Sequence, residues 1–100
     1  MHKGLGRAVL DLRSAMQWSQ TDLAVEIGKV AIKLNVQVQP VQEIVSRWER
    51  GEAAPSPQYR MLLGRVAERD SRTTHLADLF RAPESAWRLV GMVEKRNTRE

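Results

Sequence analysis

The sequence predicts an all-α fold, a bundle of four to five helices followed by a C-terminal helical extension. Three observations lead to this prediction. Apolar residues recur at alternating spacings of three and four, which is the period of one helical face. Serine or threonine stands where such stretches begin, and glycine, asparagine or proline stands where they end. The chain has 100 residues, which suits one domain with a modest core.

Composition and charge exclude several classes of protein. The chain has 16 basic and 12 acidic residues, a formal net charge of +4, and no cysteine. Without cysteine it has no disulfide framework, thiolate zinc site or cysteine nucleophile, and we expect a cytoplasmic protein. Its apolar runs are short, so we expect neither a membrane span nor a signal peptide. The mild positive charge is compatible with a nucleic-acid partner and does not require one.

The first two helices are expected at residues 5–16 and from residue 20 onward. Ser19 can accept a hydrogen bond from the Asp22 amide while the Asp22 carboxylate reaches back, which is a capping box that starts the second helix. Trp18, just before the cap, is expected in the core. The two apolar faces consist of Leu5, Val9, Leu12 and Met16 in the first helix and of Leu23, Ala24, Ile27, Ala31 and Leu34 in the second.

Residues 29–39 carry two competing patterns. Valine, isoleucine and leucine occupy every second position from Val30 to Val38, which is typical of a strand. The helical stripe of the preceding segment extends over the same residues. We favour a helix to about Leu34 and a turn at Asn35, because asparagine tolerates the left-handed conformation. Gly28 inside this helix costs about 1 kcal/mol relative to alanine.

Two further helices are predicted in the middle of the chain. Pro40 suits the first position of a third helix, and Gly51 suits the left-handed residue that ends it. Ser56 caps a fourth helix that Pro57 opens and that continues to about Arg69. The buried face of the third helix is predicted to contain Val41, Ile44, Val45 and Trp48.

We place the boundary between the main helical domain and a C-terminal segment at residue 72. Thr74 can cap a fifth helix that runs to Arg81, and Pro83 opens a last helix before residues 95–100 fray. This segment is too short for a second core, so its apolar residues either pack on the other helices or form a dimer interface. We favour a dimerisation element at residues 73–100, through Leu76, Leu79, Phe80, Trp87, Val90 and Val93.

Two motifs resemble the lambda-repressor-like, or XRE-type, helix-turn-helix family. Residues 18–28, from Trp18 to Gly28, match the pattern S-Q-x-x-L-A-x-x-x-G of the family's second helix. Residues 45–51, from Val45 to Gly51, match the pattern I/V-S-R-W-E-x-G at the end of its third helix. The resemblance covers roughly residues 5–69. It departs from the family at residues 29–39, where a longer segment replaces a tight turn.

The resemblance implies a DNA-binding domain at residues 1–72 whose third helix lies in the major groove. Gln42 would then bind adenine, Glu43 cytosine N4, and Arg47 guanine or a phosphate, while Val41 touches a thymine methyl or packs in the core. Gln20 would bond a phosphate at the start of the second helix. The weaker DNA-contact candidates are Thr21, Ser46 and Arg50. The resemblance also implies a salt bridge between Arg13 and Glu49.

Simpler roles compete with these assignments. Glu43 can pair with Arg47 on the helix surface, and Arg50 can hold the last carbonyls of the helix. Gln20 and Gln42 can be merely solvated, as can the charges of Arg13 and Glu49. The tryptophans suit a core better than a stacking platform for single-stranded nucleic acid.

The sequence therefore favours a sequence-specific regulator of transcription that binds double-stranded DNA. We expect a small bacterial, phage or plasmid repressor that binds a palindromic operator as a homodimer and is associated with the nucleoid when bound. The alternative is an antitoxin that holds a toxin through its C-terminal helices and regulates its own promoter. The sequence has no catalytic or metal-binding motif, so we expect neither an enzyme nor a cofactor.

Overall fold

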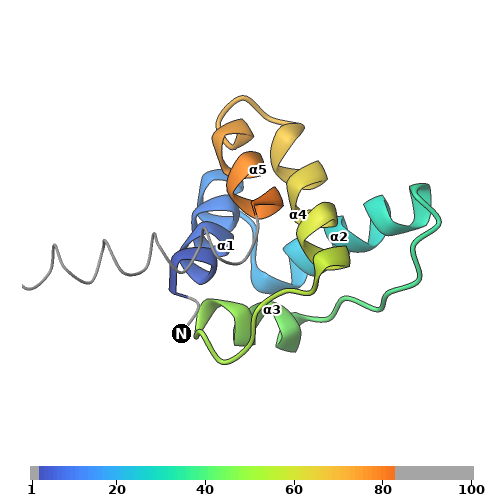
Figure 1. Ribbon diagram of the computed structural model, residues 1–100, viewed down its shortest axis with the longest axis horizontal. Helices are drawn as coiled ribbons and strands as arrows, with labels where there is room; N and C mark the ends of the chain where they lie inside the picture. The colour runs from blue at the N-terminus through green and yellow to red at the C-terminus, as the bar shows by residue number, and fades with distance from the viewer. Residues whose placement is uncertain (1–2, 83–100) are drawn as a thin grey trace, which may run out of the picture.

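The computed structural model describes residues 3–82 as a bundle of five helices (Figure 1), and this part of the chain contains no strand. The all-α prediction is confirmed for these residues. The prediction of a last helix from Pro83 onward lies outside the described residues. The helices are α1 (Lys3–Met16), α2 (Gln20–Lys33), α3 (Gln42–Glu49), α4 (Pro57–Glu68) and α5 (Thr74–Arg81).

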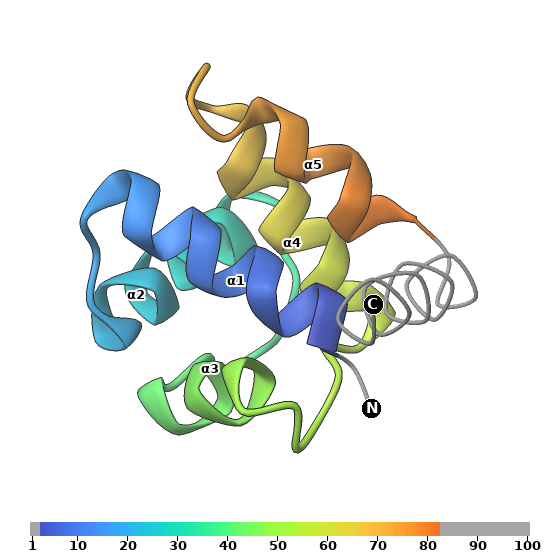
Figure 2. The same ribbon diagram turned by 90° about the vertical axis from the view of Figure 1, so that its left-hand side faces the viewer.

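One apolar core joins all five helices. α1 packs on α3 and α5, α2 packs on α3 and α4, and α4 packs on α5. Seen from the second side (Figure 2), α1 crosses the bundle between α3 and α5. Trp48 is 1% exposed and Trp18 is partly buried against the core, which confirms the core assignment of both. The largest fully buried apolar side chains are Trp48, Phe80, Leu5, Leu12, Leu23, Ile27, Leu62 and Leu63.

Side-chain caps begin α2 and α4 as the sequence predicts. The Ser19 hydroxyl accepts a hydrogen bond from the Asp22 amide at 3.0 Å, and the Asp22 carboxylate accepts one from the Ser19 amide at 2.9 Å. At α4, the Ser56 hydroxyl accepts a hydrogen bond from the Tyr59 amide, and Pro57 occupies the first helical turn. These bonds satisfy amides that have no partner inside the helix.

Three helices end at a residue with a left-handed backbone. These residues are Gln17 (φ 58°), Asn35 (φ 56°) and Gly51 (φ 74°). The amide that follows each of them bonds back to a carbonyl five residues earlier: Trp18 to Arg13, Val36 to Ala31 and Glu52 to Arg47, each at 2.9 Å. This hydrogen-bond pattern closes a helix. It confirms the turn at Asn35, and the strand pattern of residues 29–39 forms no strand.

Two predicted helix starts are wrong by one or two residues. α3 begins at Gln42 with Val41 as its N-cap, so Pro40 is not its first residue. Val41 has an extended backbone and is 54% exposed, so it does not belong to the buried face. The physical reason is a contact with α2: a Cβ placed on Gly28 would lie 3.5 Å from Cγ of Pro40. Pro40 therefore packs beside α2 before the chain turns into α3.

The start of α5 also differs from the prediction. Its N-cap is Thr73 and Thr74 is its first residue, so Thr74 is not the cap. The Thr73 side chain is fully buried and its hydroxyl donates to the Ala67 carbonyl at 2.7 Å. This bond satisfies a carbonyl near the end of α4, which a surface cap could not do. Thr73 thus fixes the turn between α4 and α5.

The structure corrects part of the predicted dimer interface. Phe80 is fully buried and Leu76 is 6% exposed, both within the core of the single chain. They are covered by the helices that α5 packs against, α1 and α4, so they cannot also line a dimer contact. Leu79 is partly buried against the same core. Trp87, Val90 and Val93 lie outside the described residues.

None of the helices in residues 3–82 combines the length and the apolar character needed to cross a membrane.

Candidate nucleic-acid interface

The C-terminal half of α3 is fixed by close packing on α1. Val45 is fully buried and Trp48 nearly so. The Trp48 ring also meets the Tyr59 ring of α4 edge to face, with the ring centroids 5.1 Å apart. A Cβ on Gly6 of α1 would lie 2.5 Å from the Trp48 carbonyl oxygen. Glycine at position 6 is therefore what allows the two helix backbones to approach.

An ion pair joins α1 to the end of α3, as the resemblance implies. The Arg13 Nε and Nη2 atoms donate to the two carboxylate oxygens of Glu49 at 2.7 and 2.9 Å. A third donor of the same guanidinium, Nη1, bonds the Trp18 carbonyl at 3.1 Å. The two side chains are only 20% and 11% exposed. A two-point bond of this kind fixes orientation as well as distance.

The Glu49 carboxyl is held in its charged form. Burial raises its pKa, but the hydrogen bonds from Arg13 and Gln20 and the charge of Arg13 together outweigh burial, so the pKa lies below its usual value. The carboxylate therefore remains an acceptor at neutral pH.

A chain of side-chain hydrogen bonds continues from this pair to the start of α3. Gln20, the first residue of α2, donates through Nε2 to Glu49 Oε1 at 3.1 Å. The side-chain oxygen Oε1 of Gln20 accepts a hydrogen bond from Nε2 of Gln42, the first residue of α3. This chain of hydrogen bonds thus links α1, both ends of α3 and the N-terminus of α2, and it runs through Arg13, Glu49, Gln20 and Gln42 in that order. Neither glutamine is merely solvated.

Several polar side chains predicted to contact DNA lie together on the exposed side of this assembly. Gln42, Glu43 and Arg47 of α3 are exposed, and so is Thr21 beside Gln20 on α2. Val41 is exposed just before α3. Arg47 forms no side-chain hydrogen bond or ion pair with the other described residues, and Glu43 lies against Arg50 instead, so the alternative surface pair of Glu43 with Arg47 does not form.

Ser46 and Arg50 differ from their predicted places. Ser46 is 7% exposed and its hydroxyl bonds Nη1 of Arg50, so it supports Arg50 and does not belong to the exposed face. Arg50 also pairs with Glu52, and its Nη2 lies 3.5 Å from Oε1 of Glu43. It therefore bonds side chains and not the last carbonyls of α3. Its hydrogen bond lowers the pKa of Glu52, and its charge is largely balanced.

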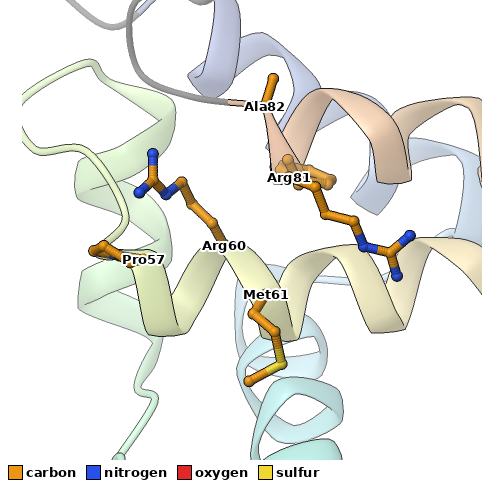
Figure 3. A pocket seen from close by; sticks show the side chains of 6 residues that line it. Pro57, Arg60, Met61, Arg81 and Ala82 are labelled. Carbon is orange, nitrogen blue, oxygen red and sulfur yellow. The ribbon is translucent and has the colours of Figure 1, made fainter.

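A pocket of about 310 Å³ lies away from this face, between α4 and the end of α5 (Figure 3). The guanidinium groups of Arg60 and Arg81 point in opposite directions around it, so they do not converge on one anion. Arg81 bonds Glu68 at 2.6 Å. Over residues 3–82, no group of three or more acidic, histidine or cysteine side chains is placed to hold a metal ion.

The side-chain network was not visible in the sequence. The motifs indicated Gln20 and Gln42 separately, but nothing in the spacing of 22 residues shows that they bond each other. Comparison with known proteins adds no further assignment: no family model, curated protein or solved structure matches the chain. The candidate site therefore stands on its geometry.

Proposed function

We propose that this protein is a sequence-specific regulator that binds double-stranded DNA through a lambda-repressor-like helix-turn-helix formed by α2 and α3. The observation that carries the proposal is the exposed α3 face of Gln42, Glu43 and Arg47, tied to the N-terminus of α2 by the Gln20–Gln42 hydrogen bond. The helix pair holds these side chains on a rigid core. A helix presented in this way fits the major groove of B-DNA.

The hydrogen bonds already made by the two glutamines leave suitable groups for DNA. Gln42 uses one N–H on Gln20, which leaves its second N–H and its carbonyl oxygen. Adenine presents an acceptor at N7 and a donor at N6 in the major groove, so this pair of groups matches it. Gln20 likewise keeps one N–H for a phosphate at the start of α2, where the helix dipole favours an anion.

The charges on the exposed face of α3 favour recognition of bases through a few directed side-chain contacts. Arg50 is balanced by Glu43 and Glu52, which leaves Arg47 as the arginine of α3 whose guanidinium is available for guanine or a phosphate. Glu43 would accept from cytosine N4, and Thr21 adds a hydroxyl contact near the phosphate that Gln20 binds. Val41 is exposed and can meet a thymine methyl. Base contacts of this kind set sequence preference, while phosphate contacts set register.

Binding to a palindromic operator would need two copies of the chain, with their α3 helices about 34 Å apart. Two of the residues proposed for the dimer contact, Leu76 and Phe80, belong to the core of the single chain, and Trp87, Val90 and Val93 lie outside the described residues. The number of chains per duplex therefore tests the dimer. The mass of the full chain, free and bound to a selected duplex, measures this: two chains per duplex are expected. A single chain per duplex would contradict the dimer without affecting the DNA-binding proposal.

The proposal is tested by selecting bound sequences from random duplex DNA. The affinity for the most enriched sequence is then measured by fluorescence anisotropy. We expect a defined preferred sequence. Arg47→Ala should weaken binding by about 10- to 100-fold, because a lost bidentate contact costs about 1–3 kcal/mol. Gln42→Ala should relax the preference at one base position.

Arg65→Ala is the matched control. Arg65 carries the same charge and is exposed in the second half of α4, where it lies 3.5 Å from Glu68. Figure 1 shows α4 running away from α3 toward α5, so this half of the helix is remote from α3. Its removal should change affinity by much less than the removal of Arg47. If the two variants lose affinity equally, binding is a general charge effect and the assignment of α3 is refuted. A wild-type protein that selects no sequence would refute specific binding.

A further inference from the structure

The segment that joins α2 to α3, residues 34–41, forms an arm with two distinct sides. Exposure alternates along it from Val36 to Val41. Val36, Val38 and Pro40 are half-buried, whereas Gln37, Gln39 and Val41 are exposed. An extended chain places successive side chains on opposite sides, so this alternation gives the arm an inner apolar side and an outer side that carries Gln37, Gln39 and the exposed Val41.

The inner side holds the arm in place. Val36 and Val38 pack against the core, and Pro40 lies beside Gly28 of α2. The amide of Val36 bonds the Ala31 carbonyl at 2.9 Å, which anchors the start of the arm to the end of α2. The arm is therefore attached along its length and presents its outer side in a defined direction.

The outer side has polar groups without partners in the described part of the chain. Gln37 and Gln39 are exposed, and neither forms a hydrogen bond with residues 3–82 through its side chain or its backbone. Lys33, the last residue of α2, is also exposed and forms no ion pair within those residues. Lys29, one turn earlier, pairs with Glu26 at 3.0 Å, so Lys33 is the lysine of this region whose charge is not balanced by an ion pair within residues 3–82.

The arm lies beside the proposed DNA-reading helix. It leads directly into Val41 and Gln42 at the start of α3, and in Figure 1 it continues outward from that end of α3 along the same side of the molecule. The five residues of extended chain from Gln37 to Val41 make four residue steps, which span about 13 Å. This length matches about four base pairs of B-DNA.

We propose that the arm is a second DNA-contacting element, which reads or clamps the duplex next to the bases read by α3. Gln37 and Gln39 contact base edges or phosphates, and Lys33 contacts a phosphate. The unpaired cation of Lys33 suits a phosphate, and the unbonded side-chain amides of Gln37 and Gln39 suit base edges or phosphates of a duplex. This inference rests on the proposed DNA binding of α3 and extends the site into the segment where the chain departs from the family pattern.

The test uses the full chain and the DNA site selected by the wild-type protein. The double variant Gln37→Ala/Gln39→Ala should bind this site about tenfold more weakly. In a repeated selection it should lose preference at positions on one side of the bases read by α3. Lys33→Ala should lower the slope of log affinity against log salt by about 1, and Arg65→Ala is its charge-matched control. The melting temperature should stay the same, since these side chains make no contact that supports the fold.

The outcomes separate the two proposals. If the wild-type protein binds its site, Arg47→Ala weakens it, and the arm variants keep the wild-type affinity, base preference and salt slope, the arm inference is refuted and the role of α3 stands. If the wild-type protein selects no DNA, both fail. If the arm variants instead lower the mass of the free protein and leave DNA affinity per chain unchanged, the arm is a contact between copies, which also refutes the inference.

Discussion

The two ends of α3 are held in very different ways. At the C-terminal end, Trp48 is buried against α1, Glu49 is bound by two nitrogens of Arg13, and Gly51 closes the helix. At the N-terminal end, the N-cap Val41 makes no side-chain capping bond and is exposed, and Gln42 is held through Gln20. The C-terminal end is held by backbone contact and charge, whereas the N-terminal end is held by the Gln20–Gln42 hydrogen bond and by the packing of Pro40 beside Gly28.

This difference separates the scaffold from the surface that would read DNA. The fixed end determines how α3 sits on the bundle, and its residues cannot be exchanged without disturbing the core. The exposed end carries Gln42 and Glu43 and is joined to the arm, so its residues can change with little cost in stability. The motif that looks most characteristic in the sequence, residues 45–51, is thus mainly structural.

The largest expected loss of stability comes from Gly6→Ala, which disturbs the packing of α1 on the C-terminal end of α3. The new Cβ would lie 2.5 Å from the Trp48 carbonyl oxygen and 3.3 Å from that of Glu49. Since both neighbours are backbone atoms, α1 and α3 must move apart, and we expect the free energy of unfolding to fall by about 3 kcal/mol. Chemical denaturation measures this loss.

Gly64→Ala is the control for that variant. Gly64 is also buried in a helix, but its new Cβ would meet the flexible Arg81 side chain at 3.0 Å. It should cost much less than Gly6→Ala, because the arginine can move aside. If both variants lowered the free energy of unfolding equally, the backbone contact between α1 and α3 would not be the contact that excludes a side chain at position 6.

The next effect is expected from Glu49→Ala, which leaves Arg13 half-buried without its carboxylate. We expect a loss of about 2 kcal/mol at pH 7, typical of a hydrogen-bonded charged group, together with weaker DNA binding because Gln20 loses its acceptor. Thermal melting and anisotropy measure the two effects. An unchanged melting temperature would show that the pair does not stabilise the fold.

The same carboxylate makes this loss depend on pH. The pKa of Glu49 is lower in the folded than in the unfolded protein, so its contribution is fully present above about pH 4.3 and disappears as the pH falls through the folded pKa. The stability difference between wild type and Glu49→Gln should therefore be constant from pH 7 to pH 5 and shrink toward pH 3. A difference that stays constant down to pH 3 would contradict the cause given for the pKa shift.

The smallest effect is expected on the arm side. Gly28→Ala should raise the free energy of unfolding by about 1 kcal/mol, because alanine favours a helix interior over glycine. The new Cβ would lie 3.5 Å from Cγ of Pro40, an ordinary contact. A destabilised Gly28→Ala would show that Pro40 packs more tightly on α2 than the structure indicates, and that the arm is held as firmly as the other end.

Local sequence signals predicted most of the helices because their causes are local. The Ser19 and Ser56 caps, the turn at Asn35 and the stop at Gly51 each depend on a few neighbouring residues. Pro40 was assigned wrongly for the opposite reason. Its fitness for the first turn of a helix is a local property, but its position is decided by the contact with Gly28, twelve residues earlier.

By itself the sequence determined the helical character of residues 3–82, the capped starts of α2 and α4, the left-handed ends of α2 and α3, and the motif residues of the candidate site. These follow from backbone preferences and from the period of apolar residues, which act over one or two turns. Only the tertiary structure decided that Gln20 bonds Gln42, that Ser46 is buried, that Phe80 belongs to the core, and that Gln37 and Gln39 share an exposed side next to α3. Such relations join residues on different helices, and their energies arise only when packing brings those helices together.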